Sequence, residues 1–262
     1  MGEVRQISDL VQGAQQAAEK WKNGRSESIP ECEFCHRPYY EECSCPGARA
    51  KTMLGYALER SRLPARYHEA TFENAKRTSH NREAYDKAFA YCDLFTFIPN
   101  PTGAYMLPDK RHGNKATVPE KSLFITGEAG EGKTYLAGAC CNLLLQKKIG
   151  VTFGNVISLL GRIKDTYKND SGESEEQAID KLTDVDLLIL DDLGKEKVTQ
   201  WTEQMLYYVI NNRYENLKPM IITSNFSLTD LKKRYEVGPY IVSRLVEICD
   251  GLRMVGDNWR KR

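Results

Sequence analysis

Short apolar runs alternate with amphipathic stretches along the second half of this sequence. Five apolar runs are too short for helices and favour buried strands; they lie at residues 122–126, 151–153, 187–190, 220–225 and 252–255. Four further stretches place apolar residues at helical spacing; these are residues 135–146, 156–167, 200–214 and 239–249. An Asp variant of the capping box at residues 227–230 opens another helix. Because strands alternate with helices, we predict an α/β domain whose parallel sheet is covered on both faces.

The first half of the chain lacks this alternation. Residues 1–25 carry apolar residues at helical spacing and predict one amphipathic helix, whose apolar stripe covers either the rest of the chain or a partner. Helical composition returns from residue 51, is broken at Pro64, and resumes over residues 82–95. Residues 96–120 are rich in proline and glycine, which predicts a loop or a hairpin insertion.

Charge and composition narrow the setting in which the protein works. The 262 residues include 37 Lys and Arg against 36 Asp and Glu, so no overall field draws the chain to nucleic acid or membrane. Any DNA contact must therefore come from a local patch. No apolar run approaches the roughly 20 residues that span a bilayer, and the polar first 20 residues lack a signal-peptide core. We expect an intracellular, reducing compartment, where cysteines more often bind metal than form disulfides.

Four of the eight cysteines are clustered near the N-terminus, as Cys32, Cys35, Cys43 and Cys45. Two close pairs joined by a short loop can place four thiolates around Zn²⁺ in a tetrahedron, although the second pair is Cys-x-Cys. His36 could replace one sulfur. The neighbouring residues are too few to build a core, so a metal would hold this knuckle together. The alternative is a loop with free surface thiols, which would be prone to oxidation.

A glycine-rich segment lies between the run at 122–126 and the stretch at 135–146. Its eight residues match G-x-x-x-x-G-K-[ST]; they are Gly127, Glu128, Ala129, Gly130, Glu131, Gly132, Lys133 and Thr134. Glycines let such a backbone form a nest of N–H groups that face phosphates, and the helix N-terminus adds its positive dipole end. Lys133 would place a cation on the transferring phosphates, and the Thr134 hydroxyl would hold Mg²⁺. The alternative is a glycine-rich turn without a ligand.

Polar residues follow the next two buried strands. Asp191 and Asp192 would leave the sheet at its carboxyl edge, where ligands bind in open α/β sheets. We expect Asp191 to hold Mg²⁺, directly or through water, and Asp192 to orient and deprotonate the attacking water. A paired Asp turn at a strand end is the alternative. Asn225 ends the following strand and could position that water or touch the γ-phosphate, or could form an Asx turn.

Arg244 lies in the predicted helix at residues 239–249, to one side of its apolar face. An exposed arginine in this position suits a finger that reaches into the ATP site of a neighbouring subunit. The alternative is a solvated salt bridge with Glu247.

Several separate motifs occur in the order and at the distances of one known family. They are the glycine-rich loop at 127–134, Leu-Leu-Ile-Leu-Asp-Asp-Leu-Gly at 187–194, Asn-Arg-Tyr at 212–214, Ile-Thr-Ser-Asn at 222–225 and Ser-Arg-Leu at 243–245. Together they resemble the AAA+ helicase loaders of the DnaC/DnaI type and their relatives, the IstB-type transposition ATPases. Residues 63–72 also look like the stretch that leads into that ATPase domain. The resemblance covers about residues 55–262, and the cysteine knuckle is similar to the zinc-bearing N-terminal domain of DnaI-type loaders.

The resemblance implies an organisation in three parts. Residues 1–50 would form a helix and zinc-knuckle domain that binds a helicase. Residues 51–120 would supply helices and an insertion that lead into the ATPase. Residues 121–262 would form the AAA+ P-loop core with a five-stranded parallel sheet in the AAA+ order.

The resemblance also assigns roles to single residues. Asn225 would be the sensor 1 residue, Arg244 the arginine finger and Arg260 the sensor 2 arginine. Tyr135, directly after the phosphate loop, would belong to the ATP site. ATP, Mg²⁺ and Zn²⁺ would be the bound groups. The helix at residues 159–167 would correspond to the element that lines a channel for single-stranded DNA.

The implied function is an ATP-dependent loader that delivers a hexameric replicative DNA helicase onto single-stranded DNA during replication initiation. Such a protein would self-assemble with ATP in the cytoplasm of a bacterium, or of the bacterial host of a phage, without a membrane partner. Hydrolysis would be slow, because Asp192 stands where faster AAA+ enzymes commonly have Glu.

Two other functions compete with the loader. One is an IstB-type transposition helper that binds duplex DNA and a transposase, against which the cysteine knuckle argues. The other is an adaptor that senses ATP and binds a partner without turnover. Asp191, Asp192 and Arg244 argue against the adaptor, because a protein without turnover needs neither a catalytic base nor a finger.

Overall fold

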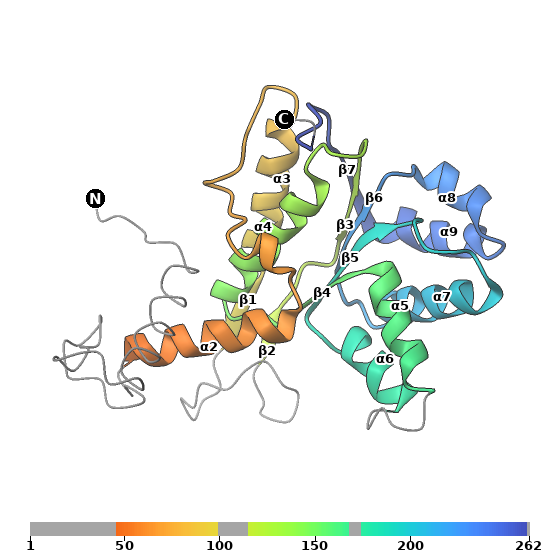
Figure 1. Ribbon diagram of the computed structural model, residues 1–262, viewed down its shortest axis with the longest axis horizontal. Coiled ribbons are helices and arrows are strands. Elements are labelled where there is room, and N and C mark those ends of the chain that lie inside the picture. Colours follow the sequence, from red (N-terminus) through yellow and green to blue (C-terminus); the bar gives the residue numbers. More distant parts are fainter. Residues whose placement is uncertain (1–45, 99–114, 168–173, 261–262) are drawn as a thin grey trace, which may run out of the picture.

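The computed structural model describes residues 46–98, 115–167 and 174–260 (Figure 1). The first elements in the chain are α2 (Pro46–Ser61), the 3₁₀ helix η1 (Ala65–Tyr67), α3 (Arg82–Asp93), β1 (Thr96–Ile98) and β2 (Lys115–Thr117). The elements that follow are β3 (Ser122–Thr126), α4 (Lys133–Gln146), β4 (Val151–Asn155), α5 (Val156–Asp165), α6 (Glu175–Thr183), β5 (Leu187–Leu193), α7 (Gln200–Glu215), β6 (Met220–Ser224), α8 (Leu228–Arg234), α9 (Gly238–Ile248) and β7 (Cys249–Arg253). The helix predicted over residues 1–25 lies outside the described residues.

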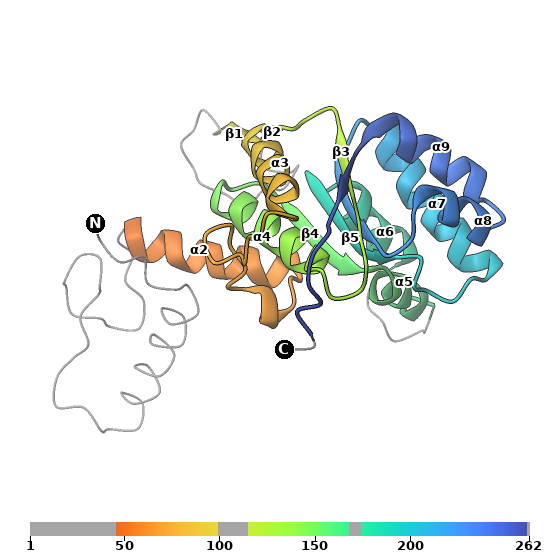
Figure 2. The same cartoon turned by 90° about the horizontal axis from the view of Figure 1, so that it is seen from above.

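Five strands form one parallel sheet in the order β4-β5-β6-β3-β7. The strand before the glycine-rich loop, β3, lies inside the sheet and pairs with β6 on one side and with β7 on the other. Parallel neighbours need crossover connections, which place helices over the faces of the sheet. Helices α2, α3 and α4 cover one face, and α5 to α9 lie on the other (Figures 1 and 2). The predicted five-stranded parallel sheet is confirmed.

The inner strands are apolar along their length because both faces of the sheet are buried. In β3, Leu123 and Ile125 belong to the core under α2, α3 and α4, while Phe124 belongs to the core under α5 to α9. Alternate residues of a strand point to opposite faces, so one strand contributes to two separate cores. The other buried strands divide in the same way; Leu187, Ile189 and Ile221 join the first core, and Leu188, Leu190, Met220 and Ile222 join the second.

The segment before the sheet is anchored on α4. The side-chain amide of Asn142 donates hydrogen bonds to the carbonyl oxygens of Tyr67 and Ala70, over 2.9 and 2.7 Å. Leu58 and Phe72 are buried in the same core as the first face of the sheet. The predicted lead-in segment therefore packs directly onto the helix that carries the phosphate loop.

Part of the predicted insertion at 96–120 is a hairpin. Strands β1 and β2 pair in antiparallel fashion, with Thr96 opposite Thr117. The residues between these strands, 99–114, lie outside the described part of the chain. A hairpin at this place is one of the two forms that the proline and glycine content predicts.

Several predicted boundaries need correction, and two of them concern elements next to the phosphate loop. Helix α4 begins at Lys133, two residues earlier than the apolar spacing indicates, because the end of the phosphate loop already has helical geometry. The last strand, β7, spans Cys249–Arg253 and not residues 252–255. It pairs with β3 over Ser122–Thr126 and lies at an edge of the sheet. Edge strands are partly exposed, so the exposed residues Asp250 and Gly251 hide the start of the strand from an apolar pattern.

Arg213 on α7 is fully buried although it carries a charge. Its guanidinium donates hydrogen bonds to five backbone carbonyls; these belong to Leu182, Thr183, Val185, Asp186 and Pro219. Burial lowers its pKa to about 9. One arginine thus ties the end of α6 and the turns before β5 and β6 together, because buried carbonyls need donors.

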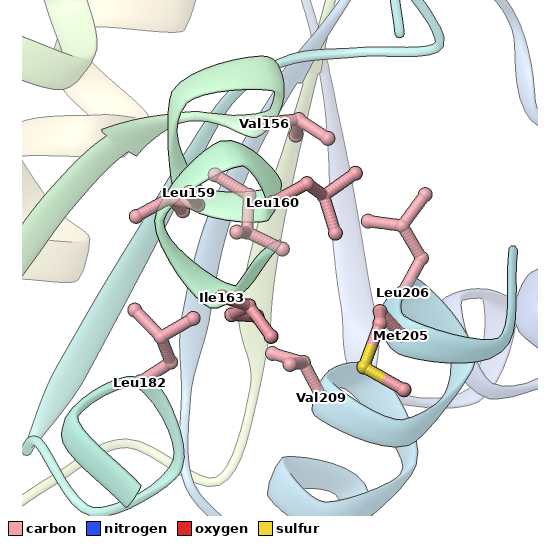
Figure 3. A pocket seen from close by; sticks show the side chains of 9 residues that line it. Val156, Leu159, Leu160, Ile163, Leu182, Met205, Leu206 and Val209 are labelled. Carbon is pink, nitrogen blue, oxygen red and sulfur yellow. The ribbon is translucent and has the colours of Figure 1, made fainter. Parts of the chain in front are cut away.

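A small apolar pocket lies between α5, α6 and α7 (Figure 3). It is lined by Val156, Leu159, Leu160, Ile163, Leu182, Leu190, Met205, Leu206 and Val209. These side chains offer no hydrogen-bonding group to a phosphate or a base, so the pocket belongs to the core and not to a nucleotide site. No helix in the described residues is long and apolar enough to cross a membrane.

Candidate nucleotide-binding site

The glycine-rich loop joins the carboxyl end of β3 to the first turn of α4. Gly130 and Gly132 both have a left-handed φ of +95°, which residues with a Cβ atom rarely adopt. Gly132 is the N-cap of α4, so the loop ends where the helix presents its unpaired N–H groups. The local geometry is therefore that of a phosphate-binding nest at a helix N-terminus.

Lys133 is folded back over the loop. Its ammonium donates hydrogen bonds to the carbonyl oxygens of Gly127 and Glu128, over 2.8 and 2.7 Å. Only 5% of the residue is exposed, and this burial lowers the pKa of Lys133. The cation stays within the loop that would hold phosphates, as its place in the motif predicts.

Asp191 connects the loop to two strands of the sheet. Its Oδ1 accepts a hydrogen bond of 2.7 Å from Thr223 on β6, and its Oδ2 accepts one of 3.3 Å from Thr134 on α4. Burial raises the pKa of Asp191. A hydroxyl and a carboxylate in contact are the oxygen ligands that Mg²⁺ prefers, so Thr134 and Asp191 fit the predicted magnesium site.

Asp192 stands at an irregularity of β5. The pairing of β5 with β6 shifts register between Leu190 and Leu193, and Asp192 has a left-handed φ of 63°. Its N–H donates to Thr223 Oγ1 over 2.9 Å. Its carboxylate is turned toward Lys195, at 2.7 Å, and toward the side-chain amide of Asn155, at 3.4 Å. The strand thus continues beyond residue 190, and at the bulge the two carboxylates have different partners.

The C-terminal segment lies against the phosphate loop. The N–H of Trp259 donates to the carbonyl oxygen of Gly130 over 3.0 Å, and that of Gly256 donates to Glu131 Oε1 over 3.3 Å. A side chain at position 130 would collide with Asn258. Arg260 follows directly and is exposed. This placement brings the predicted sensor 2 arginine close to the loop in the fold.

Two predicted site residues, Asn225 and Tyr135, lie outside the hydrogen bonds that the Asp191 and Asp192 carboxylates make. Asn225 follows β6 directly and is exposed, while the hydrogen bonds of the Asp191 and Asp192 carboxylates go to other side chains. The hydroxyl of Tyr135 donates to the carbonyl oxygen of Thr71 over 3.3 Å and accepts from the Thr71 N–H. Tyr135 therefore joins α4 to the lead-in segment, and its part in nucleotide binding stays a prediction.

Arg244 is held on the surface of α7. Its guanidinium donates to Asn211 Oδ1, to the Tyr207 hydroxyl and to the carbonyl oxygen of Tyr240. It also lies over the ring of Tyr214. None of these partners belongs to the phosphate loop or to the aspartate pair, which is the arrangement a residue acting in another subunit requires.

The alternative partner of Arg244 is engaged elsewhere. The Glu247 carboxylate accepts a hydrogen bond of 2.9 Å from the Tyr214 hydroxyl, and its backbone carbonyl accepts one from Lys121. Arg244 and Glu247 are both among the described residues, and no ion pair joins them. The simple salt bridge that sequence alone allowed is therefore not formed.

None of the candidate ligands of the predicted zinc site is among the residues that the structure describes. Cys32, Cys35, His36, Cys43 and Cys45 all lie outside the described residues. Within the part of the chain that the structure describes, no group of histidine, cysteine and acidic side chains could hold a metal ion. The described cysteines Cys92, Cys140 and Cys141 are buried, and Cys249 is partly buried. Zinc binding stays a prediction.

Sequence reasoning missed three residues at this site. Thr223 bonds to both aspartates, Lys195 pairs with Asp192, and Asn155 approaches Asp192 from β4. A signal existed for two of them. Asn155 and Thr223 are polar residues at the carboxyl ends of apolar strands, where ligand sites lie in parallel sheets. Lys195 follows Gly194 in a turn and carries no such signal.

The strand order, the loop at the end of β3 and the aspartates on β5 define a P-loop nucleotide-binding domain of the AAA+ class. A family model described as IstB-like ATP binding protein matches residues 116–262. The match covers more than half of the chain, and the chain belongs to this family of ATP-binding proteins.

Two replicative helicase loaders are similar to part of this chain. The replicative helicase loader DnaC of Escherichia coli K12 is 31% identical over 112 residues, which are 43% of this chain and 45% of the relative. The replicative helicase loader DnaI of Bacillus subtilis is 24% identical over an alignment of 151 positions, which covers 53% of this chain and 48% of the relative. The aligned part thus spans about half the length of these relatives.

Solved structures show the same fold. The crystal structure of the DnaC helicase loader superposes with a TM-score of 0.57 at 25% identity, covering 73% of this chain and 99% of that one. The replication initiator DnaA, bound to AMPPCP and single-stranded DNA, gives a TM-score of 0.57 at 20% identity, covering 75% of this chain and 52% of that one. The resemblance to DnaC/DnaI-type proteins that the motifs indicate is confirmed.

Proposed function

We propose that this protein is an ATP-dependent loader that delivers a hexameric replicative DNA helicase onto single-stranded DNA. The observation that carries the proposal is the joint contact of Thr134 and Thr223 with the Asp191 carboxylate. Through this contact, the phosphate loop and strand β5, which carries the aspartates, form a single site. The names of the DnaC and DnaI relatives supply the helicase as partner.

ATP would bind with its phosphates in the nest at 127–134 and its Mg²⁺ on Thr134 and Asp191. Bound Mg²⁺ would neutralise phosphate charge during transfer. Asp192, whose carboxylate has other partners than that of Asp191, would hold the attacking water and accept its proton. Asn225 would position that water, and Arg260 would contact the phosphates from the C-terminal segment.

Assembly would complete the site. Arg244 has all its contacts on α7 and α9, away from its own phosphate loop, and would reach the γ-phosphate of a neighbouring copy. The DNA contact would lie on α5, where Arg162 and Lys164 are exposed and supply the local basic patch that a nearly neutral chain needs. The helicase would be bound through residues 1–50.

A steady-state phosphate-release assay tests the enzymatic part of this proposal. We expect slow turnover that rises when single-stranded DNA is added, and no turnover above background for Asp192→Asn. Co-purification from host lysate, with the partner identified by mass, tests the loader part. Recovery of a replicative helicase supports the proposal. Phosphate release at background level in the wild type contradicts the hydrolysis and favours an ATP-sensing adaptor. Release above background that is equal in wild type and Asp192→Asn contradicts the role of Asp192 as the base.

The family description favours a second candidate, a transposition helper ATPase. Such a protein would bind duplex DNA and a transposase. The same two assays separate the candidates. Stimulation by duplex DNA but not by single strands, together with co-purification of a transposase, would show that the protein is a transposition helper and not a helicase loader.

A further inference from the structure

Lys195 has a direct contact with the proposed catalytic base. Its ammonium lies 2.7 Å from Asp192 Oδ1, and the two side chains are 32% and 18% exposed. The other carboxylate oxygen, Oδ2, is 3.4 Å from the side-chain amide of Asn155. Both oxygens of the carboxylate therefore have protein partners in this structure.

The turn that carries Lys195 is firmly held. Its N–H donates to the carbonyl oxygen of Asp192 over 3.2 Å, and Gly194 has a left-handed φ of +96°. The N–H of Gly194 donates to the buried Glu196 carboxylate over 3.0 Å. The Glu196 carboxylate also accepts a hydrogen bond from the Tyr235 hydroxyl, and the Glu196 backbone carbonyl accepts one from Arg234. The backbone on both sides of Lys195 is thus fixed, so the ammonium can leave Asp192 only by rotation about the side-chain bonds of Lys195.

Asp192 is equally constrained on its own strand. Its left-handed backbone is secured by the hydrogen bond from its N–H to Thr223 Oγ1. The carboxylate can therefore turn only about its side-chain bonds. An attacking water that uses Oδ1 must compete with the ammonium of Lys195 for the same oxygen, and general-base catalysis requires that this oxygen reach the water.

We propose that Lys195 is a positioning residue that holds the Asp192 carboxylate in an ion pair and so keeps basal ATP turnover low. The inference rests on the hydrolysis proposed above and adds a restraint to it. Turnover proceeds when the pair opens and Asp192 turns toward the water. The residue acts through Asp192 and needs no contact with the nucleotide.

Lys195→Met tests the restraint, because it keeps the length of the side chain and removes the charge. We expect kcat without DNA to rise about fivefold, equivalent to about 1 kcal/mol of barrier, while KM for ATP stays unchanged. Lys195→Arg keeps the cation and should retain the low rate. Lys197→Met, two residues further on and exposed, is the matched control and should behave as wild type.

The double variant Lys195→Met/Asp192→Asn links the gain to the base, since the rise should disappear when Asp192 is replaced. A wild-type or lower kcat for Lys195→Met, with DNA-stimulated turnover intact in the wild type, overturns the restraint but leaves the proposed function standing. If DNA stimulates no variant while the kcat of Lys195→Met exceeds that of the wild type, the restraint holds and the proposed DNA-dependent function fails. If neither the wild type nor any variant releases phosphate above background, both the restraint and the proposed function are contradicted.

Discussion

Arg244 on α9 donates a hydrogen bond of 2.9 Å to the hydroxyl of Tyr207 on α7. Asn211, one helical turn after Tyr207, accepts from the Nε of the same guanidinium. Side chains four residues apart lie on one face of a helix, so α7 presents a ready-made seat for the arginine. This seat limits the rotamers of Arg244, so the arginine would lose less entropy at a subunit interface than a free side chain would.

Arg244→Ala should leave ATP affinity of the isolated chain nearly unchanged, because Arg244 has no contact with its own phosphate loop. It should lower DNA-stimulated turnover by roughly tenfold or more, since an arginine finger stabilises the transition state. Titration with a fluorescent ATP analogue and phosphate release measure the two effects. Tyr207→Phe should cause a smaller loss, and Tyr208→Phe, exposed on the same helix, should cause none.

Mixing Arg244→Ala with Asp192→Asn decides whether the arginine acts between subunits. In mixed assemblies an intact Arg244 can meet an intact Asp192 at a shared interface, which neither variant offers alone. Phosphate release should therefore exceed that of either variant by itself. If every mixing ratio gives only the average of the two variants, Arg244 serves its own subunit or the surface of α7.

Lys133→Ala should weaken ATP binding by roughly tenfold to a hundredfold, because a charge-assisted hydrogen bond contributes about 1.5–3 kcal/mol. The substitution removes the cation that the loop carbonyls of Gly127 and Glu128 hold in place. Calorimetric titration with ATP and Mg²⁺ measures the change, and Lys197→Ala is the exposed control. If Lys133→Ala binds ATP as tightly as the wild type, the phosphate loop is not the ATP site.

Arg213→Leu should destabilise the fold by about 3 kcal/mol or more, because each buried carbonyl left without a donor costs about 1–3 kcal/mol. Leucine offers no donor to the five carbonyls that Arg213 bonds. Urea unfolding followed by circular dichroism gives the free energy of unfolding. Arg82→Leu, exposed at the start of α3, should change it little, and equal values for both would show that Arg213 is dispensable.

Purified protein should contain about one zinc ion per chain if the N-terminal cysteines form a tetrahedral site. Elemental analysis measures the content, and Cys32→Ser should lower it. Chelation should unfold only the N-terminal portion and leave ATP affinity, measured after Mg²⁺ is restored, intact, because none of the candidate zinc ligands belongs to the phosphate loop. Full metal content in Cys32→Ser would show that the cysteines belong to an ordinary loop.

The sequence predicts the interior of the sheet better than its edge. Strands β3, β5 and β6 are buried on both faces, so their apolar runs stand out, and the aspartates after the apolar part of β5 follow from strand and spacing. Strand β7 is exposed at the edge, and its Asp250 and Gly251 break the pattern that the other strands keep. Burial requires apolar residues and so leaves a pattern in the sequence, whereas an exposed edge requires none.

The residues of the candidate site also differ in how well the sequence predicts them. Lys133, Thr134 and Asp191 belong to local motifs whose residues lie close in the chain, and the structure brings the two motifs together. The partners Thr223 and Lys195 depend on the turn of one carboxylate and on the pairing of distant strands. A bulge in β5 decides which oxygen faces which neighbour, and no residue pattern encodes that bulge.

The pairing of β3 also sets the order in which the protein can mature on the ribosome. The strand that leads into the phosphate loop is synthesised before its two neighbours in the sheet, β6 and β7, which begin at residues 220 and 249. At roughly 5–20 residues per second, the loop waits on the order of 10 s for them. A nascent chain that stops before residue 249 lacks one of these neighbours. The proposed capture of ATP would therefore follow the synthesis of β7, and only chains that include this strand could join an ATP-dependent assembly.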